Sequence, residues 1–161
     1  MKNLHLAALA LATLSGSAMA ADHGLFYVAG GASARGANFS VGLGTNVDVL
    51  EISSINLGTV NGNDSAKFVG LSLVQNATPV NNFNWLFRVG FGKTTTTFAD
   101  GSSATRLGFR DGVIFGVGGQ YQLNSHVAVR GELNRMTYAT SADDLSHKII
   151  YPATISALFS F

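Results

Sequence analysis

The chain has 161 residues, of which 47% are hydrophobic and only 12% are charged, about half of the roughly 25% charged residues in ordinary soluble domains. Its ten Lys and Arg nearly balance nine Asp and Glu. The net charge therefore gives no indication that the chain binds nucleic acid or attaches to a membrane surface through a polybasic segment. It contains no cysteine, which excludes disulfides, thiol chemistry and cysteine-based metal sites.

The first twenty residues have the features of a secretory signal peptide. Residues 1–3 form a short basic start, residues 4–14 are an apolar run, and residues 18–20 read Ala-Met-Ala, which matches a cleavage site. We therefore expect residues 1–20 to be a signal peptide and residues 21–161 to form a single domain. Outside this segment, no apolar run reaches the ~18 residues of a spanning helix. High hydrophobicity without long runs is typical of a transmembrane β-barrel.

Alternation of apolar and polar residues with a period of two predicts eight strands after the signal segment. They cover residues 24–32, 38–44, 47–57, 67–75, 83–92, 112–122, 126–136 and 151–161. The strand at 83–92 has the strongest pattern, with Phe and Trp residues on one face and Arg88 and glycines on the other. In the first strand the facing stays open, because Phe26 and Tyr27 are adjacent aromatic residues.

The connections between these strands differ in length in a regular way. Those near residues 45, 79 and 124 are short, whereas those at 58–65, 93–111 and 137–148 are longer and polar. Short turns at one end and larger loops at the other are typical of an outer-membrane barrel with its turns in the periplasm. Strands of about nine to eleven residues cross the membrane at a tilt near 45°. The sequence therefore predicts an all-β fold, an eight-stranded antiparallel up-and-down transmembrane β-barrel.

If the apolar faces point outward, the inward residues are small or polar, with four charges among them. These charges are Glu51, Arg88, Arg130 and Glu132. Counted from the short turns, they lie near mid-height, and charges inside so narrow a barrel must be paired. We predict an interior salt-bridge cluster that plugs the barrel, with a gated ion path or a catalytic carboxylate as the alternatives. Because side chains just fill an eight-stranded barrel, we expect no passage of metabolites.

Aromatic side chains gather on the outward face near the short-turn end of the strands. They are Phe83, Trp85, Tyr121, Phe159 and Phe161. Such a position is typical of the aromatic girdle at a membrane interface. Pro152 lies within the predicted closing strand, where it requires either a bulge or a place near the outer rim.

The remaining motifs in the sequence predict no catalytic, cofactor-binding or metal-binding site. Gly92-Lys93-Thr94 resembles the end of a phosphate-binding loop, but the required earlier glycine is Phe87. The histidines at 23, 126 and 147 have no His, Asp or Glu at ligand spacing. We therefore expect neither a metal nor a cofactor.

Several stretches are similar to the OmpA-like transmembrane β-barrel family, the small eight-stranded porin-family barrels of Gram-negative bacteria. The stretches are residues 49–58, 112–122 and 127–135, together with the terminal Phe161. The resemblance implies interior charges at Glu51, Arg88 and Glu132, which supports the plug. It also implies that Phe161 is the sorting signal read by the barrel-assembly machinery. The chain carries no peptidoglycan-binding domain after the barrel, so we expect no anchoring role.

These observations predict a non-enzymatic protein of the outer membrane with a role in envelope integrity or surface interaction. Its expected partners are outer-membrane lipids, lipopolysaccharide and, through the closing strand, the barrel-assembly machinery; we expect a monomer that binds no nucleic acid. An enzyme of the lipid A deacylase kind is one alternative, although residues 130–135 lack the His-x-Ser pair of such enzymes. A small gated ion pore is another, and a soluble lipocalin-like carrier is disfavoured by the polar inward faces.

Overall fold

The structure, a computed structural model, describes residues 25–33, 35–45, 47–77, 80–107, 112–141 and 147–161. The predicted signal peptide, residues 1–20, lies outside these ranges, as does His23. No helix in the described ranges is long and apolar enough to span a membrane.

The described residues form ten β-strands. They are β1 (Leu25–Ser33), β2 (Gly36–Gly44), β3 (Asp48–Asn61), β4 (Asp64–Asn76), β5 (Phe83–Thr97), β6 (Ser103–Leu107), β7 (Val113–Gln122), β8 (Val127–Ala139), β9 (His147–Ile150) and β10 (Ala153–Ser160).

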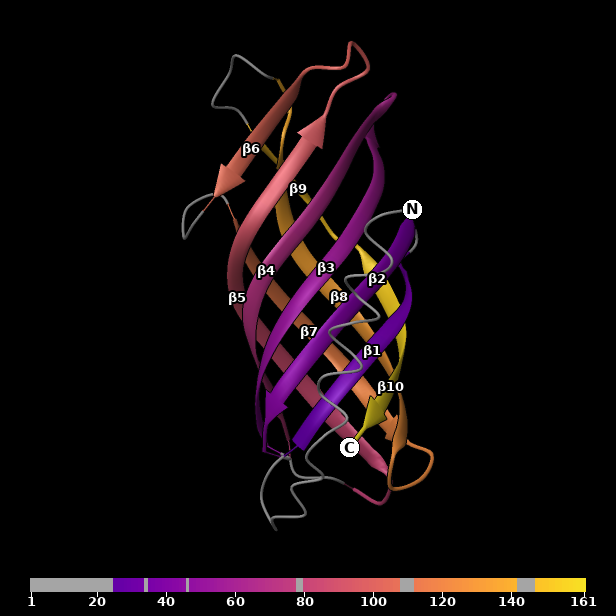
Figure 1. Ribbon diagram of the computed structural model, residues 1–161. Helices are drawn as coiled ribbons and strands as arrows, with labels where there is room; N and C mark the ends of the chain where they lie inside the picture. The colour runs from indigo at the N-terminus through magenta and orange to yellow at the C-terminus, as the bar shows by residue number, and fades with distance from the viewer. Residues whose placement is uncertain (1–24, 34, 46, 78–79, 108–111, 142–146) are drawn as a thin grey trace.

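Eight of the strands in the described residues close into an antiparallel barrel. Their order is β10-β1-β2-β3-β4-β5-β7-β8, and the pairing of β8 with β10 completes the circle. The short strands β6 and β9 pair with the ends of β5 and β8 and add to the wall at one end (Figure 1). The tail meets the head as predicted, with Ser160 opposite Tyr27. This topology confirms the predicted eight-stranded up-and-down barrel.

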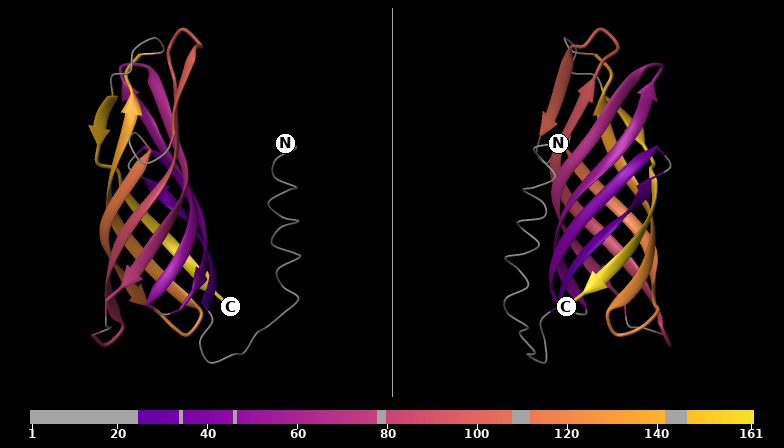
Figure 2. Two further views of the ribbon diagram at one scale, coloured as in Figure 1. Left: turned by 90° about the vertical axis from the view of Figure 1, so that its left-hand side faces the viewer. Right: turned by 45° about the vertical axis from the view of Figure 1, so that its right-hand side comes forward.

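The two ends of the barrel differ. At one end, here called the turn end, β1 begins, β10 finishes, and short connections follow β2, β4 and β7. At the other, the loop end, β3, β4 and β5 rise beyond β1, β2 and β10, so that the rim is uneven (Figures 1 and 2). The longer strands cause this difference, because β3 and β5 have 14 and 15 residues and β2 has nine.

The outer face of the barrel is apolar around its circumference. Large hydrophobic side chains on all eight wall strands are exposed or half-buried there, among them Leu43 (64%), Ile52 (62%), Trp85 (63%) and Ile155 (59%). A continuous exposed apolar surface of this size is unfavourable in water. It is the surface that a lipid-embedded barrel presents to acyl chains. The fold is therefore a transmembrane β-barrel.

The interior is more apolar than the sequence predicted. A lower apolar layer lies toward the turn end and consists of Tyr27, Ala29, Val49, Val74, Leu86, Ala128 and Leu158. An upper apolar layer lies toward the loop end and consists of Ile55, Leu57, Ala66, Phe68, Ile114, Met136 and Tyr138. The expectation that small, polar and charged residues alone line the barrel was therefore incomplete. Side chains fill so narrow a barrel, and apolar ones do so without unpaired polar groups.

Three segments predicted as loops are partly strand. β3 continues to Asn61 and β4 begins at Asp64, so that most of 58–65 belongs to a hairpin whose turn uses Gly62 at φ 62°. β5 continues to Thr97 and pairs with β6, within the predicted loop 93–111. β8 continues to Ala139 and pairs with β9. These extensions contain many Thr, Ser and Asn residues, and β-branched threonine favours strands without giving an apolar signal.

The structure also shows which way the side chains of β1 face and where Pro152 lies. In β1, Tyr27 and Ala29 point inward, while Phe26 and Val28 are half-buried on the outer face. Pro152 precedes β10 at the loop end, so the closing strand is shorter than predicted. The carbonyl of Pro152 accepts a hydrogen bond from the amide of Asn134 at 3.0 Å. Proline at this position removes no hydrogen bond of the ladder from β10.

Two neighbouring residues of β4 provide a test of which side chains point into the barrel and which point outward. Phe68 is fully buried, whereas its neighbour Val69 is 43% exposed on the outer face. We expect Phe68→Ala to lower the free energy of unfolding by about 3–5 kcal/mol, because it leaves a cavity. Val69→Ala should cost only about 1 kcal/mol, since lipid fills the space. Urea unfolding in lipid vesicles, followed by the fluorescence of Trp85, measures both. Equal losses would mean that the facing is wrong.

Candidate functional site

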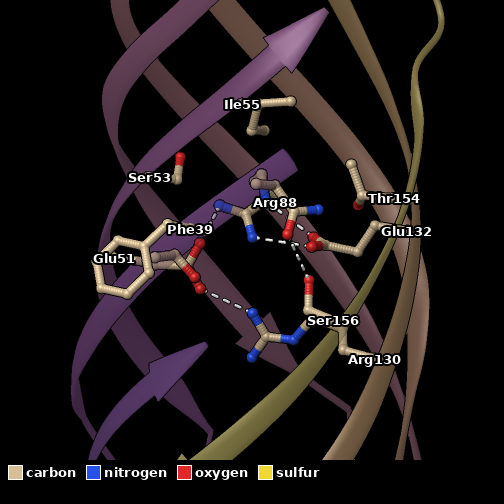
Figure 3. A pocket seen from close by; sticks show the side chains of 11 residues that line it. Phe39, Glu51, Ser53, Ile55, Arg88, Arg130, Glu132, Thr154 and Ser156 are labelled. Atoms are coloured by element: carbon tan, nitrogen blue, oxygen red, sulfur yellow. Dashed lines mark hydrogen bonds and ion pairs between the residues drawn. The ribbon is translucent and has the colours of Figure 1, made fainter. Parts of the chain in front are cut away.

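Four charged side chains meet inside the barrel between the two apolar layers (Figure 3). They are Glu51 on β3, Arg88 on β5, and Arg130 and Glu132 on β8, and their exposures are 0%, 4%, 2% and 9%. Each occupies an inward position of its strand, because successive residues of a strand alternate between the two faces. The structure thus brings together all four predicted charges, which we call the interior charge cluster.

The cluster is a chain of ion pairs. Arg88 joins the two carboxylates, since its Nη1 lies 2.6 Å from Glu51 Oε1 and its Nε and Nη2 donate to Glu132 at 2.9 and 3.1 Å. Arg130 Nη1 lies 2.7 Å from the other Glu51 oxygen. Two guanidinium groups and two carboxylates give zero net charge. Buried charges persist when they are paired and hydrogen-bonded in this way.

Two further residues complete the cluster. The hydroxyl of Tyr27 donates to Glu51 Oε2 and accepts from Arg130 at 3.2 Å. The Arg130 guanidinium carbon also lies 5.1 Å from the centre of the Tyr27 ring, within the range of a cation–π contact. Gln120 Oε1 accepts from Arg130 Nε and Nη2 at 3.2 and 3.0 Å. Gln120 is not among the predicted members of the cluster, and the sequence pattern left the facing of Tyr27 open.

Glycines on neighbouring strands make room for these side chains. Gly42 lies opposite Tyr27, and a Cβ atom at Gly42 would stand 2.3 Å from the Tyr27 ring. Gly118 lies opposite Glu132, and a Cβ atom there would stand 2.9 Å from Glu132 Cγ. Any larger residue at either position would displace the cluster. Glycine at positions 42 and 118 therefore leaves room for the buried Tyr27 and Glu132 side chains.

Little free space remains beside the cluster. A cavity of about 10 Å³ borders Glu51, Arg88, Arg130 and Glu132 and is also lined by Ser53 and Thr154 (Figure 3). A cavity of this size holds about one water molecule. The buried Ser53 hydroxyl has no hydrogen-bond partner among the described residues, so a water in this cavity would satisfy it.

The arrangement offers little chemistry beyond mutual neutralisation. Both carboxylates are engaged by guanidinium groups, which makes them poor general bases. Within the described ranges, no group of three or more His, Asp or Glu side chains could hold a metal ion. His126 lies at the turn end and His147 begins β9, far apart along the strands.

The five predicted girdle residues lie near the turn end. Trp85, Tyr121, Phe159 and Phe161 are 49–72% exposed, and Phe83 is half-buried. Phe83 meets Trp85 edge to face, with 5.1 Å between the ring centres, and pairs across the ladder with Tyr121. The amide of Phe161 donates to the carbonyl of Phe26 at 2.9 Å, and the two rings lie 5.8 Å apart. The terminal residue is thus held against β1.

Fold, outer surface and paired interior together define the chain as a transmembrane β-barrel of eight strands. No protein-family model matches it, and no curated protein matches it.

Several solved structures are similar to the chain. Neisserial surface protein A is 12% identical, with a TM-score of 0.47, over 86% of this chain and 94% of that one. The attachment invasion locus protein Ail of Yersinia pestis, crystallised with the heparin analogue sucrose octasulfate, is 14% identical, with a TM-score of 0.43, over 88% and 100%. A designed transmembrane β-barrel is 12% identical, with a TM-score of 0.46, over 86% and 95%. At these identities and scores, we infer no function from the likeness.

The central position of Glu51 can be tested by removing its charge. We expect Glu51→Gln to lower the free energy of unfolding by about 3–5 kcal/mol, because Arg88 and Arg130 would then share one carboxylate in a buried place. Asp48→Asn is the matched control on the same strand, since Asp48 is exposed and its carboxylate accepts a hydrogen bond from the exposed Gln75; it should change stability by less than about 0.5 kcal/mol. Urea titration in lipid vesicles measures both, and similar values would mean that the cluster adds no stability.

Proposed function

We propose that the chain is an integral outer-membrane protein of a Gram-negative bacterium, similar to the OmpA-like barrels, without enzymatic activity. Its role is in envelope integrity or surface interaction. The observation that carries this proposal is the combination of an apolar outer face with an interior in which every charge of the cluster is paired. The signal-like residues 1–20 support export.

The interior supports a plugged lumen. The interior charge cluster and the two apolar layers occupy successive levels of the barrel, and the cavity at the cluster measures about 10 Å³. Ions crossing such an interior would have to pass apolar side chains on both sides of the cluster. We infer that the barrel is a closed structural body whose contacts with other molecules are made at its surface.

The surface available for such contacts lies at the loop end. The β5–β6 hairpin extends beyond the body of the barrel there, on the side opposite the C-terminus (Figure 2). We propose that this end faces the cell exterior, and that the closing strand with Phe161 is read by the barrel-assembly machinery at the turn end. We further propose a monomer that contacts outer-membrane lipids and lipopolysaccharide and needs no cofactor.

Localisation is tested by fractionation. We expect the mature chain in the outer-membrane fraction, with different gel mobility before and after boiling, because a folded barrel resists detergent until it is heated. A matched sample of the periplasmic extract should contain none. Recovery of the chain in that extract, with no shift on boiling, would contradict the membrane proposal and favour a soluble carrier.

The closed lumen is tested by planar-bilayer recording of the folded barrel. We expect no discrete conductance steps in the unmodified protein, in Glu51→Ala or in Arg88→Ala, because the apolar layers still fill the barrel on both sides of the cluster. Asp48→Ala serves as an exposed control, and heat-modifiable mobility confirms that each variant is folded. Conductance steps that appear only in Glu51→Ala and Arg88→Ala would favour a gated pore instead.

A further inference from the structure

Two lysines stand where the apolar outer face ends on β4 and β5. Lys67 follows Val69 toward the loop end of β4, and Lys93 follows Phe91 toward the loop end of β5; both lysines are exposed. In the ladder, Lys93 is opposite Val69 and Lys67 is opposite Thr95. The two lysines are therefore diagonal neighbours, roughly 7–8 Å apart. In the proposed outer-membrane location, their ammonium groups would meet the boundary between acyl chains and headgroups.

A polar groove is lined in part by Lys67 and lies next to Lys93, which is two residues along β5 from the lining residue Thr95. It has a volume of about 540 Å³ and crosses the outer face of β3, β4 and β5, and its lining includes Asn56, Thr59, Ser65, Lys67, Thr95 and Thr97. A bulge in β3 accompanies the groove, with register shifts after Asn56 and Thr59 and with Gly58 at φ 64°. Bulges bend a strand locally. Hydroxyl and amide groups therefore face outward here, where the rest of the barrel shows apolar side chains.

The charge around the groove is positive. Arg35 donates from Nη1 to the carbonyl of Thr59, which places a third cation at its edge. Among the described residues, the acid closest in sequence to Lys67 is Asp64, which is only 8% exposed and accepts the amide of Ala99 at 3.0 Å. No acidic side chain lines the groove in the described part of the chain. An anion in the groove is attracted by these cations, and no acidic side chain of the described lining repels it.

We propose that this groove binds the phosphorylated headgroup of an outer-leaflet glycolipid. The phosphate contacts Lys67 and Lys93, the sugar hydroxyls contact the Thr, Ser and Asn side chains, and the acyl chains lie on Val69, Leu71 and Phe91 below. A lipid is favoured over a soluble anion because the next outward residue after Lys67 on β4 is the exposed Val69, so an occupant gains from having both an anionic head and apolar chains. The inference rests on the proposed outer-membrane location.

The test uses the refolded mature chain in nanodiscs of neutral phosphatidylcholine that contain bisphosphorylated lipid A. After extraction into mild detergent, native mass spectrometry counts the lipid A molecules that stay bound. At about 1 kcal/mol per cation near a membrane surface, Lys67→Gln with Lys93→Gln should weaken retention about thirtyfold. Arg135→Gln with Lys148→Gln is the matched control, because it removes two cations from β8 and β9, outside this groove. We expect it to retain lipid A as the unmodified protein does.

Three results would overturn the proposal. They are unchanged retention in the Lys67/Lys93 variant, an equal loss in the control variant, and equal retention of dephosphorylated lipid A by the unmodified protein. The second would mean that binding is a general property of the basic rim. Heat-modifiable mobility shows beforehand that each variant is folded. A chain that fails to insert into phosphatidylcholine vesicles would refute the outer-membrane function itself, which is a separate outcome.

Discussion

The structure depends on the pairing of Glu51. An eight-stranded barrel has room for side chains inside but little for water, so a charge within it must find its counter-charge from another strand. Glu51 does so twice, because one of its oxygens meets Arg88 and the other meets Arg130 and Tyr27. These partners come from β1, β5 and β8, so that one carboxylate ties together strands on different sides of the wall. Glycines 42 and 118 are needed because these groups are bulky.

The apolar layers above and below make this pairing stronger as well as necessary. Apolar side chains lower the local dielectric, which raises both the attraction between opposite charges and the penalty for an unpaired one. The two layers and the charge cluster are therefore not independent features. This dependence explains why a barrel with a largely polar-looking inward pattern nevertheless contains Phe68, Leu86 and Ile114 in fully buried places.

Much of this organisation could be predicted from the sequence, because the period of two in strands such as 83–92 fixes which side chains share a face. This alternation alone placed four charged residues on the inward side: Glu51, Arg88, Arg130 and Glu132. It could not place Tyr27, because Phe26 and Tyr27 satisfy either facing equally well. It also missed the strand extensions at 93–97 and 137–139, where polar β-branched residues pair without an apolar signal. The apolar layers were missed because buried leucines inside a barrel look the same in sequence as lipid-facing ones.

The charged side chains inside the barrel and those at its rim differ in whether acidic side chains lie next to them. Inside, each guanidinium of the cluster has a carboxylate within 3 Å. At the loop end, Lys67 and Lys93 stand on the outer face without an acid lining the adjacent groove in the described residues. Burial explains the difference, since an unpaired charge is costly in the interior but tolerable at a hydrated boundary. Under the lipid-binding proposal, Lys67 and Lys93, which have no acidic side chain beside them in the described groove lining, meet an anion that itself lies at the membrane surface.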